Sequence, residues 1–304
     1  MELSEVVLRD GRRVDIALGG DDHGRPVLLQ HGLPGSRLTA AHADDAARET
    51  GVRLVSLSRP GFGRSSPAAP SLAGRGHDAI EVVTALGIDR FAVLGTSGGA
   101  PAAAATAVVG GDRVTALGIA VGVGPWNELE PPDHPGLAAE REIVASCARG
   151  NTDEALDAYR RLAATWFDDM LGRESDEELM AVFDALVAAD EHAAEDGLQG
   201  AEDMSWETPQ LRARFAQDLR EALVTYDGIA IDNLSVGLPW DVDVSTVTQP
   251  THLWFGDRDA LVADVHRAWW QRQIPHARLT MRVGQGHGGA YLAHWREMFE
   301  ALTC

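Results

Sequence analysis

The sequence contains no lysine. All 26 of its basic residues are arginine, in a chain of 304 residues. Without a lysine amine the protein cannot form a Schiff base with a substrate or with pyridoxal phosphate. The phosphate-cradling loop that ends in Gly-Lys-Ser/Thr is excluded for the same reason. The absence of one residue type therefore removes several classes of enzyme chemistry.

Cysteine is also scarce. The two thiols, Cys147 and Cys304, are too few for a disulfide framework, and they do not have the spacing of a metal site. The His-Glu-x-x-His motif of zinc peptidases does not occur either. The sequence therefore predicts a protein that uses neither a metal nor an organic cofactor.

Long hydrophobic runs and basic patches are missing as well. No run of eighteen apolar residues occurs, and the opening residues Met-Glu-Leu-Ser-Glu do not have the order of a signal peptide. The formal net charge of −20 argues against nucleic acid or an anionic membrane as a partner, because phosphate binding needs basic patches. We therefore expect a cytoplasmic protein that binds a small-molecule substrate. The sequence leaves open whether it forms a homo-oligomer.

What is present begins with short apolar runs that alternate with helical stretches. Residues 5–8 and 14–18 alternate like paired strands around a turn at Asp10 and Gly11. Later runs are short and wholly apolar, which is typical of a parallel sheet. These predicted strands are residues 27–29, 54–57, 91–94 and 115–121. The predicted helices between them lie around residues 37–49, 76–86 and 100–109, so the order is that of an α/β protein.

The alternation stops near residue 125 and returns near residue 250. From about 137 to 230 the residues have helical spacing, and strands are predicted again at 251–255 and 278–283 before a last helix at 290–302. An all-helical insertion of this kind is typical of a cap over the carboxyl ends of the strands, where open sheets bind ligands. We therefore predict a core of residues 1–124 and 241–304 with a helical cap at 125–240.

The predicted cap holds nearly all of the negative charge. It contains 26 aspartates and glutamates against 8 arginines, a net charge of −18. A solvated helical surface accounts for this composition better than a cation-binding face does.

One motif provides a candidate nucleophile. Gly95-Thr96-Ser97-Gly98-Gly99 matches G-x-S-x-G and stands between the predicted strand 91–94 and an alanine-rich helix. Such a sharp turn presents a serine hydroxyl above a sheet, and small neighbours let strand and helix approach closely. A serine hydroxyl needs a base within hydrogen-bond reach and donors for the developing oxyanion. Ser97 is therefore the candidate nucleophile.

The candidate base and acid come late in the chain. His287 lies in a glycine-rich loop, residues 284–289, just after the last predicted strand. The ordinary pKa of histidine suits a proton shuttle near neutral pH. A carboxylate is needed to hold the imidazole tautomer, and two aspartates, Asp257 and Asp259, follow the preceding strand. The residues alone do not decide between them.

A second glycine-containing motif predicts an oxyanion hole. His31-Gly32-Leu33-Pro34-Gly35 follows the strand 27–29, and glycine and proline fix a loop whose amides can point at one spot. The predicted donors are the backbone amides of Leu33 and Gly98. We expect His31 to brace this loop rather than to act as the base.

Together these motifs resemble the α/β-hydrolase superfamily over essentially the whole chain. The candidates follow in the order Ser, Asp, His, which is the order of that superfamily. The resemblance implies a mostly parallel central sheet flanked by helices, with an inserted helical cap. It also implies Ser97 as nucleophile, His287 as base, Asp259 as the acid of a Gly-x-x-Asp pattern and Leu33 as an oxyanion residue.

One loop departs from the family pattern. Residues 59–65, Arg-Pro-Gly-Phe-Gly-Arg-Ser, resemble the family loop after the fourth strand. The family often has an aspartate before the arginine, and this chain has Ser58 there. The difference concerns bracing of the loop and leaves the predicted triad intact.

The resemblance excludes some types of reaction but leaves several classes of substrate open. Haloalkane dehalogenases and epoxide hydrolases need an aspartate where Ser97 stands, so the sequence predicts a serine hydrolase of small carboxylic esters or lactones. The alternatives are a proline iminopeptidase-like enzyme, a carbon–carbon bond hydrolase, and a non-hydrolytic ligand-binding or biosynthetic protein. Iminopeptidases often carry a tryptophan where this chain has Gly98, although their caps also use acidic residues.

Aromatic residues of the predicted cap are candidates for substrate binding. They are Trp126, Trp166 and Trp206. Packing between the cap and the core is the other role open to them.

Overall fold

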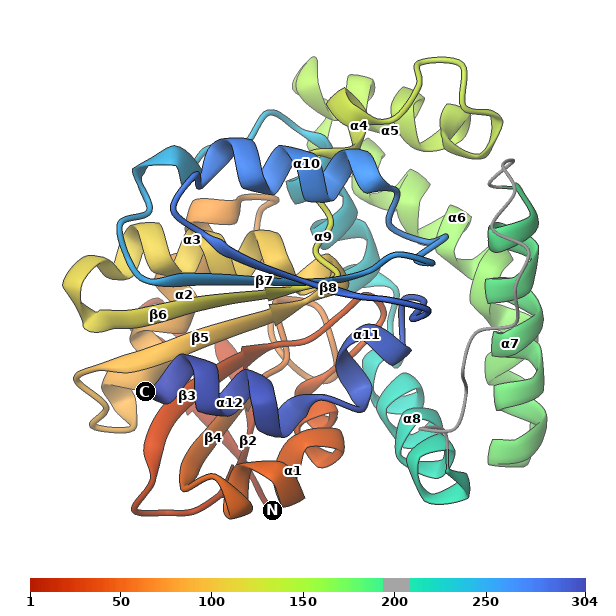
Figure 1. The fold of residues 1–304 in the computed structure, drawn as a ribbon. Coiled ribbons are helices and arrows are strands. Elements are labelled where there is room, and N and C mark those ends of the chain that lie inside the picture. Colours follow the sequence, from red (N-terminus) through yellow and green to blue (C-terminus); the bar gives the residue numbers. More distant parts are fainter. Residues whose placement is uncertain (194–207) are drawn as a thin grey trace.

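The computed structural model describes residues 1–193 and 208–304, and within them eight strands form one sheet in the order β1-β2-β4-β3-β5-β6-β7-β8 (Figure 1). The strands are β1 (Glu2–Val7), β2 (Arg13–Gly20), β3 (Arg25–Gln30), β4 (Val52–Leu57), β5 (Phe91–Thr96), β6 (Val114–Ala120), β7 (Thr251–Gly256) and β8 (Arg278–Arg282). Strand β2 pairs antiparallel with β1 and β4, and every other pair is parallel. The mostly parallel sheet predicted from the sequence is therefore confirmed.

The central strands are apolar throughout because helices cover both faces of the sheet. On β3 and β5 the side chains alternate between two buried clusters. Leu28 and Val93 are paired in register and face the first cluster, whereas Val27 and Ala92 are paired and face the second. The first face is covered by α2 (Leu72–Ala85), α3 (Ala100–Gly110) and α10 (Asp264–Gln273), and the second by α1 (Ala40–Glu49) and α12 (Trp295–Thr303) (Figure 1).

Between β6 and β7 the described residues form helices and no strand. The longer helices are α5 (Ala138–Ala148), α6 (Thr152–Leu171), α7 (Asp176–Ala193), α8 (Pro209–Ala222) and α9 (Asp227–Gly237), preceded by the single turn α4 (Trp126–Leu129). We call helices α4 to α9 the insertion. In Figure 1 they lie beyond one end of the strands. The exact domain boundaries and the role of the insertion as a cap stay predictions.

The structure differs from the sequence-based expectation in two places. The helix α10 was not predicted, because its ten residues are mostly polar and the residue before it, Ala263, provides no side-chain cap. The predicted last helix is interrupted at residues 293–294 and forms α11 (Gly289–Leu292) and α12. No helix in the described parts of the chain is long and apolar enough to cross a membrane. The cellular location stays a prediction.

Candidate active site

Ser97 lies at the sharp junction between β5 and the helix α3. Its φ of +50° is a left-handed conformation that few residues other than glycine adopt, and such strain is concentrated at functional sites. Gly95 and Gly99, on either side of Ser97, are required because other parts of the chain approach their Cα atoms closely. A Cβ on Gly95 would lie 2.7 Å from the Cβ of Ala103, and one on Gly99 would clash with the carbonyl oxygens of residues 30 and 31. The sequence motif and the observed turn therefore agree.

Asp259 and His287 meet through a hydrogen bond. The distance from His287 Nδ1 to Asp259 Oδ2 is 2.9 Å, and the Asp259 side chain is only 2% exposed. The other carboxylate oxygen accepts hydrogen bonds from the amides of Leu261 and Val262, at 3.1 and 2.9 Å. A carboxylate accepts here, so the imidazole donates from Nδ1, and Nε2 is the nitrogen that can take up a proton.

The second aspartate of this loop has a different partner. Asp257 is exposed, and its Oδ1 accepts a hydrogen bond of 2.6 Å from the amide of Gly284. This contact ties the end of β7 to the loop that carries His287. Gly256 is needed there as well, because a Cβ would collide with the carbonyl oxygen of Gln285. Of the two aspartates left open by the residues alone, the structure brings Asp259 to His287.

The sheet order explains why distant residues share one edge. Strands β5, β6, β7 and β8 are parallel neighbours, so their carboxyl ends lie together (Figure 1). Ser97 follows β5, Asp259 follows β7 and His287 follows β8. The loop after β6 also touches the nucleophile turn, since the amide of Val123 donates to the Ser97 carbonyl at 3.3 Å.

The two predicted oxyanion donors lie against each other. A Cβ placed on Gly98 would be 2.7 Å from the Cβ of Leu33 and 3.5 Å from its amide nitrogen. A Cβ on Gly32 would be 3.6 Å from the Cβ of Ser97. The loop after β3 therefore runs directly beside the candidate nucleophile, and only glycine at position 98 allows that approach.

His31 holds this loop from inside. It is fully buried; its Nδ1 lies 2.7 Å from the carbonyl oxygen of Gly32, and its Nε2 accepts a hydrogen bond of 3.1 Å from the amide of Arg59. Burial, and to a smaller extent the Arg59 guanidinium, holds the pKa of His31 well below its ordinary value. The ring is therefore neutral and protonated on Nδ1. Its two contacts brace the loop, as expected from the sequence.

Helix α8 of the insertion contacts the segment that follows this loop. Asp218 accepts hydrogen bonds from the amide and hydroxyl of Ser36, at 2.8 and 2.5 Å, and from the hydroxyl of Thr39 at 2.6 Å. Burial raises the pKa of Asp218 to about 7, although these hydrogen bonds act in the opposite direction. Glu221 pairs with the Arg37 guanidinium at 2.8 Å. These contacts were missed from the sequence because nothing distinguishes Asp218 or Glu221 from the other carboxylates of the insertion.

Two of the three candidate substrate-binding tryptophans lie in the described part of the chain. Trp126 in α4 is 8% exposed and packs in an apolar cluster with Tyr159 and Leu234. Trp166 in α6 is half-buried, with its ring 6.1 Å from that of Phe167. Trp206 lies outside the described residues. A role of these residues in substrate binding stays a prediction.

Within residues 1–193 and 208–304, no group of three or more histidine, cysteine, aspartate or glutamate side chains could hold a metal ion.

A model of the alpha/beta hydrolase fold family matches residues 25–292. The chain belongs to the α/β-hydrolase fold family. This confirms the superfamily that the motifs suggested, and the match covers the loop at residues 31–35, the turn at Ser97, the insertion and the Asp259–His287 pair. No curated protein sequence matches the chain significantly.

Solved structures give the same fold at low sequence identity. A hydrolase from Pseudomonas aeruginosa PA01 is 19% identical with a TM-score of 0.66, and the match covers 99% of this chain and 98% of that one. The enol-lactonase from Burkholderia xenovorans LB400 is 15% identical with a TM-score of 0.62, covering 99% and 100%. The epoxide hydrolase CorEH is 17% identical with a TM-score of 0.68, covering 99% and 97%. Because these proteins differ in chemistry, the likeness shows the fold alone.

Proposed function

We propose that the protein is a serine hydrolase that cleaves a small carboxylic ester or lactone through an acyl-enzyme intermediate. The observation that supports this most is the hydrogen bond between Asp259 and His287 at the edge of the sheet where Ser97 also lies. Family membership supports a hydrolase in general. Serine as the nucleophile and an ester or lactone as the substrate are the parts that the proposal adds.

In the proposed reaction, Nε2 of His287 takes the hydroxyl proton of Ser97 as the serine oxygen attacks the substrate carbonyl. Asp259 keeps the imidazole in the working tautomer and stabilises the imidazolium that forms. The amides of Leu33 and Gly98 donate to the oxyanion of the tetrahedral intermediate. This intermediate expels the alkoxide, which takes the proton from His287 and leaves the acyl group on Ser97.

The second half of the reaction releases the acid. His287 takes a proton from a water molecule, and the hydroxide attacks the acyl carbonyl. The new tetrahedral intermediate breaks its bond to the Ser97 oxygen, which recovers the proton from His287. The enzyme is restored, and the only reactants consumed are one ester and one water.

An ester or lactone fits these groups better than an epoxide does. A neutral serine hydroxyl with two amide donors beside it is suited to a planar carbonyl, whose oxygen becomes the oxyanion. The resemblance implies an aspartate nucleophile for epoxide hydrolysis, and Ser97 stands at that position. An enol-lactonase has the same fold, so this fold is compatible with a lactone substrate.

The proposal is tested with the Ser97→Ala variant and a small panel of substrates. The panel contains p-nitrophenyl acetate and butyrate, γ-butyrolactone, prolyl-p-nitroanilide and a vinylogous β-diketone for carbon–carbon cleavage. We expect turnover of the esters or the lactone by the wild type and a loss of about 10⁴-fold or more in kcat for Ser97→Ala. The exposed Ser4→Ala, on β1, is the matched control and should keep full activity.

Other results would change the assignment. Turnover of the anilide alone would make the protein an iminopeptidase-like enzyme, and cleavage of the diketone alone would make it a carbon–carbon bond hydrolase. Binding of ligands without turnover of any of them would favour a non-hydrolytic protein on the same scaffold. Unchanged ester hydrolysis by Ser97→Ala would remove Ser97 from the mechanism.

A further inference from the structure

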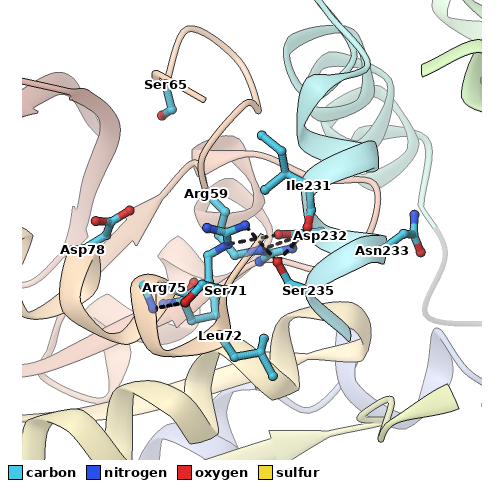
Figure 2. Close-up of polar contacts among 12 residues, drawn as sticks. Arg59, Ser65, Ser71, Leu72, Arg75, Asp78, Ile231, Asp232, Asn233 and Ser235 are labelled. Atoms are coloured by element: carbon cyan, nitrogen blue, oxygen red, sulfur yellow. Dashed lines mark hydrogen bonds and ion pairs between the residues drawn. The ribbon is translucent and has the colours of Figure 1, made fainter. Parts of the chain in front are cut away.

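A buried ionic cluster connects the insertion to the core (Figure 2), and one of its residues, Arg59, also contacts residues 31 and 32 of the loop at residues 31–35, here called the oxyanion loop. Arg59, from the loop after β4, and Arg75, from α2, both contact Asp232 of the insertion helix α9. The Arg59 Nη2 and Nε atoms each lie 2.7 Å from Asp232 Oδ2, and Arg75 Nε lies 3.4 Å from Oδ1. The three residues are between 1% and 4% exposed. Such deep burial sets this cluster apart from the solvated ion pairs on the surface of the insertion.

The cluster carries one more positive charge than negative charge. Asp232 forms ion pairs with two guanidinium groups, those of Arg59 and Arg75. The Nη1 atom of Arg75 is buried without a hydrogen-bond partner. A buried charge without its own counter-charge costs free energy, so the arrangement is poor as a device for stability alone. The residue before Arg59 is Ser58, so no carboxylate comes from the position where the family often has one. The one carboxylate that pairs with both arginines, Asp232, comes from the insertion.

The other side of the Arg59 guanidinium faces the oxyanion loop. Its Nη1 donates to the carbonyl oxygen of His31, and its Nη2 donates to that of Gly32 at 3.2 Å. The Gly32 carbonyl also accepts from His31 Nδ1 at 2.7 Å. This carbonyl belongs to the same peptide group as the amide N–H of Leu33. Two donors therefore fix the oxygen end of the peptide whose nitrogen end is the proposed oxyanion donor.

Hydrogen bonding at one end of a peptide group changes the other end. A cationic donor on the carbonyl oxygen draws electron density from the nitrogen and makes its N–H a stronger donor, because hydrogen bonds in series polarise one another. The same contacts limit rotation of the peptide plane, so the N–H keeps its direction. Both effects matter most when negative charge develops on the substrate oxygen.

We propose that Arg59 and Asp232 are positioning residues for the oxyanion hole, so that helix α9 of the insertion sets the direction and strength of the Leu33 amide. Asp232 holds the guanidinium by its Nε and Nη2 edge, and the guanidinium holds the Gly32–Leu33 peptide. Neither side chain touches the substrate. This inference rests on the proposed function, because it assigns the Leu33 amide to the oxyanion.

The backbone of α9 fits this role. The amide of Gly228 donates to the carbonyl of Gly61 at 3.0 Å, and a Cβ on Gly228 would collide with the ring of Phe62. The Phe62 ring in turn packs against His31, with ring centroids 4.9 Å apart. Helix α9 therefore packs directly against the loop that contains Arg59. A shift of the helix would displace Phe62 and, through its contact with His31, the oxyanion loop.

The test compares Asp232→Asn with Asp227→Asn. Asp227 is the matched control because it lies on the same helix, is partly exposed and pairs with Arg160 within the insertion at 2.5 Å. For p-nitrophenyl butyrate we expect Asp232→Asn to lower kcat by about 10- to 100-fold with KM changed less than about threefold, since a misdirected donor affects the transition state. The Kd for butylboronic acid, which forms a tetrahedral adduct with a serine nucleophile, should rise by the same factor as kcat/KM falls. Asp227→Asn should match the wild type in both measurements.

Two further variants keep the proposal testable if Asp232→Asn does not fold. The double variant Asp232→Asn/Arg75→Met keeps the net charge of the cluster and still releases Arg59, so it should show the same loss in kcat. Arg59→Lys keeps a positive charge, but a lysine amine cannot bind the carboxylate and both carbonyl oxygens together. We therefore expect its kcat to be lowered to the level of Asp232→Asn. Folding of each variant is checked by its near-ultraviolet circular dichroism.

The outcomes separate this inference from the proposed function. If wild-type protein hydrolyses the ester and Ser97→Ala does not, the proposed function stands. If, in that case, the folded Asp232 variants keep wild-type kcat and boronate affinity, the positioning role of Arg59 and Asp232 is wrong. A fall in kcat matched by an equal rise in KM would also contradict it, because that pattern indicates a disturbed substrate site. Ester hydrolysis that survives in Ser97→Ala would refute the proposed function itself.

Discussion

The buried carboxyl of Asp218 leads to a prediction about stability and pH. Burial raises its pKa from the ordinary 3.8 to about 7, and its partners are Ser36 and Thr39, which carry no charge. Between these two pH values the folded protein keeps a proton on Asp218 that the unfolded chain has released. The contribution is therefore fully present below about pH 4, and the free energy of unfolding falls as pH rises toward 7.

The size of the effect follows from the shift. One pKa unit corresponds to about 1.4 kcal/mol, so a shift of about three units corresponds to an upper bound of about 4 kcal/mol. The variant Asp218→Asn has a neutral side chain of the same shape at every pH. Its amide can donate to the Thr39 hydroxyl while its oxygen accepts from Ser36. We therefore expect the variant to be close to the wild type at pH 4.5 and more stable than the wild type at pH 8.

The assay is urea unfolding followed by circular dichroism at half-unit steps from pH 4.5 to 8.5. The difference in free energy of unfolding between the wild type and Asp218→Asn cancels the titration of all other groups. The control Asp169→Asn removes an exposed carboxylate of the insertion that pairs with Arg173. A difference that stays constant over the whole range, for Asp218→Asn as for the control, would show that Asp218 does not keep its proton in the folded protein.

Two further predictions concern the site and its substrate. Asp259→Asn should lower kcat by about 10⁴-fold, because an amide cannot hold His287 in the working tautomer. Asp257→Asn, which loses only the contact to Gly284, should stay within about threefold, and the reverse order of the two variants would show that the wrong aspartate has been assigned. Polyanionic esters should be turned over poorly at low salt, because the insertion has a net charge of −18 that is screened beyond roughly 8 Å at physiological salt. The measurement is kcat/KM for a neutral ester and its dicarboxylate analogue at two salt concentrations, and equal values at low salt would exclude a role of that charge in selection.

The sheet and the turn at Ser97 were predictable because each is specified by local sequence. Apolar runs bounded by turns mark the central strands, and small residues mark a place where backbone segments meet closely, as at Gly95 and Gly98. The pairing of Asp259 with His287 was predictable only through the resemblance. Two aspartates stand two residues apart at the end of the same strand, and their different orientations depend on how the loop folds.

The contacts between the insertion and the core were not predictable. Asp218 and Asp232 are single carboxylates in a segment that has many, and helical spacing does not distinguish a carboxylate that faces solvent from one that faces a buried arginine. Arg59 was recognised as part of a family loop, but its partner lies 173 residues further along the chain. Such pairs depend on how helices pack against the sheet, which the local sequence does not encode.

The most direct test of the proposed mechanism is to trap the acyl-enzyme. The wild-type protein is mixed with p-nitrophenyl butyrate, quenched in acid within the first turnover and digested with trypsin. Because the chain has no lysine, cleavage after Arg90 and Arg113 gives a peptide of residues 91–113 in which Ser97 is the only serine. We expect this peptide to carry the butyryl group in the wild type and no acylated peptide to form in Ser97→Ala. Rapid turnover with the butyryl group on a residue other than Ser97 would contradict this mechanism.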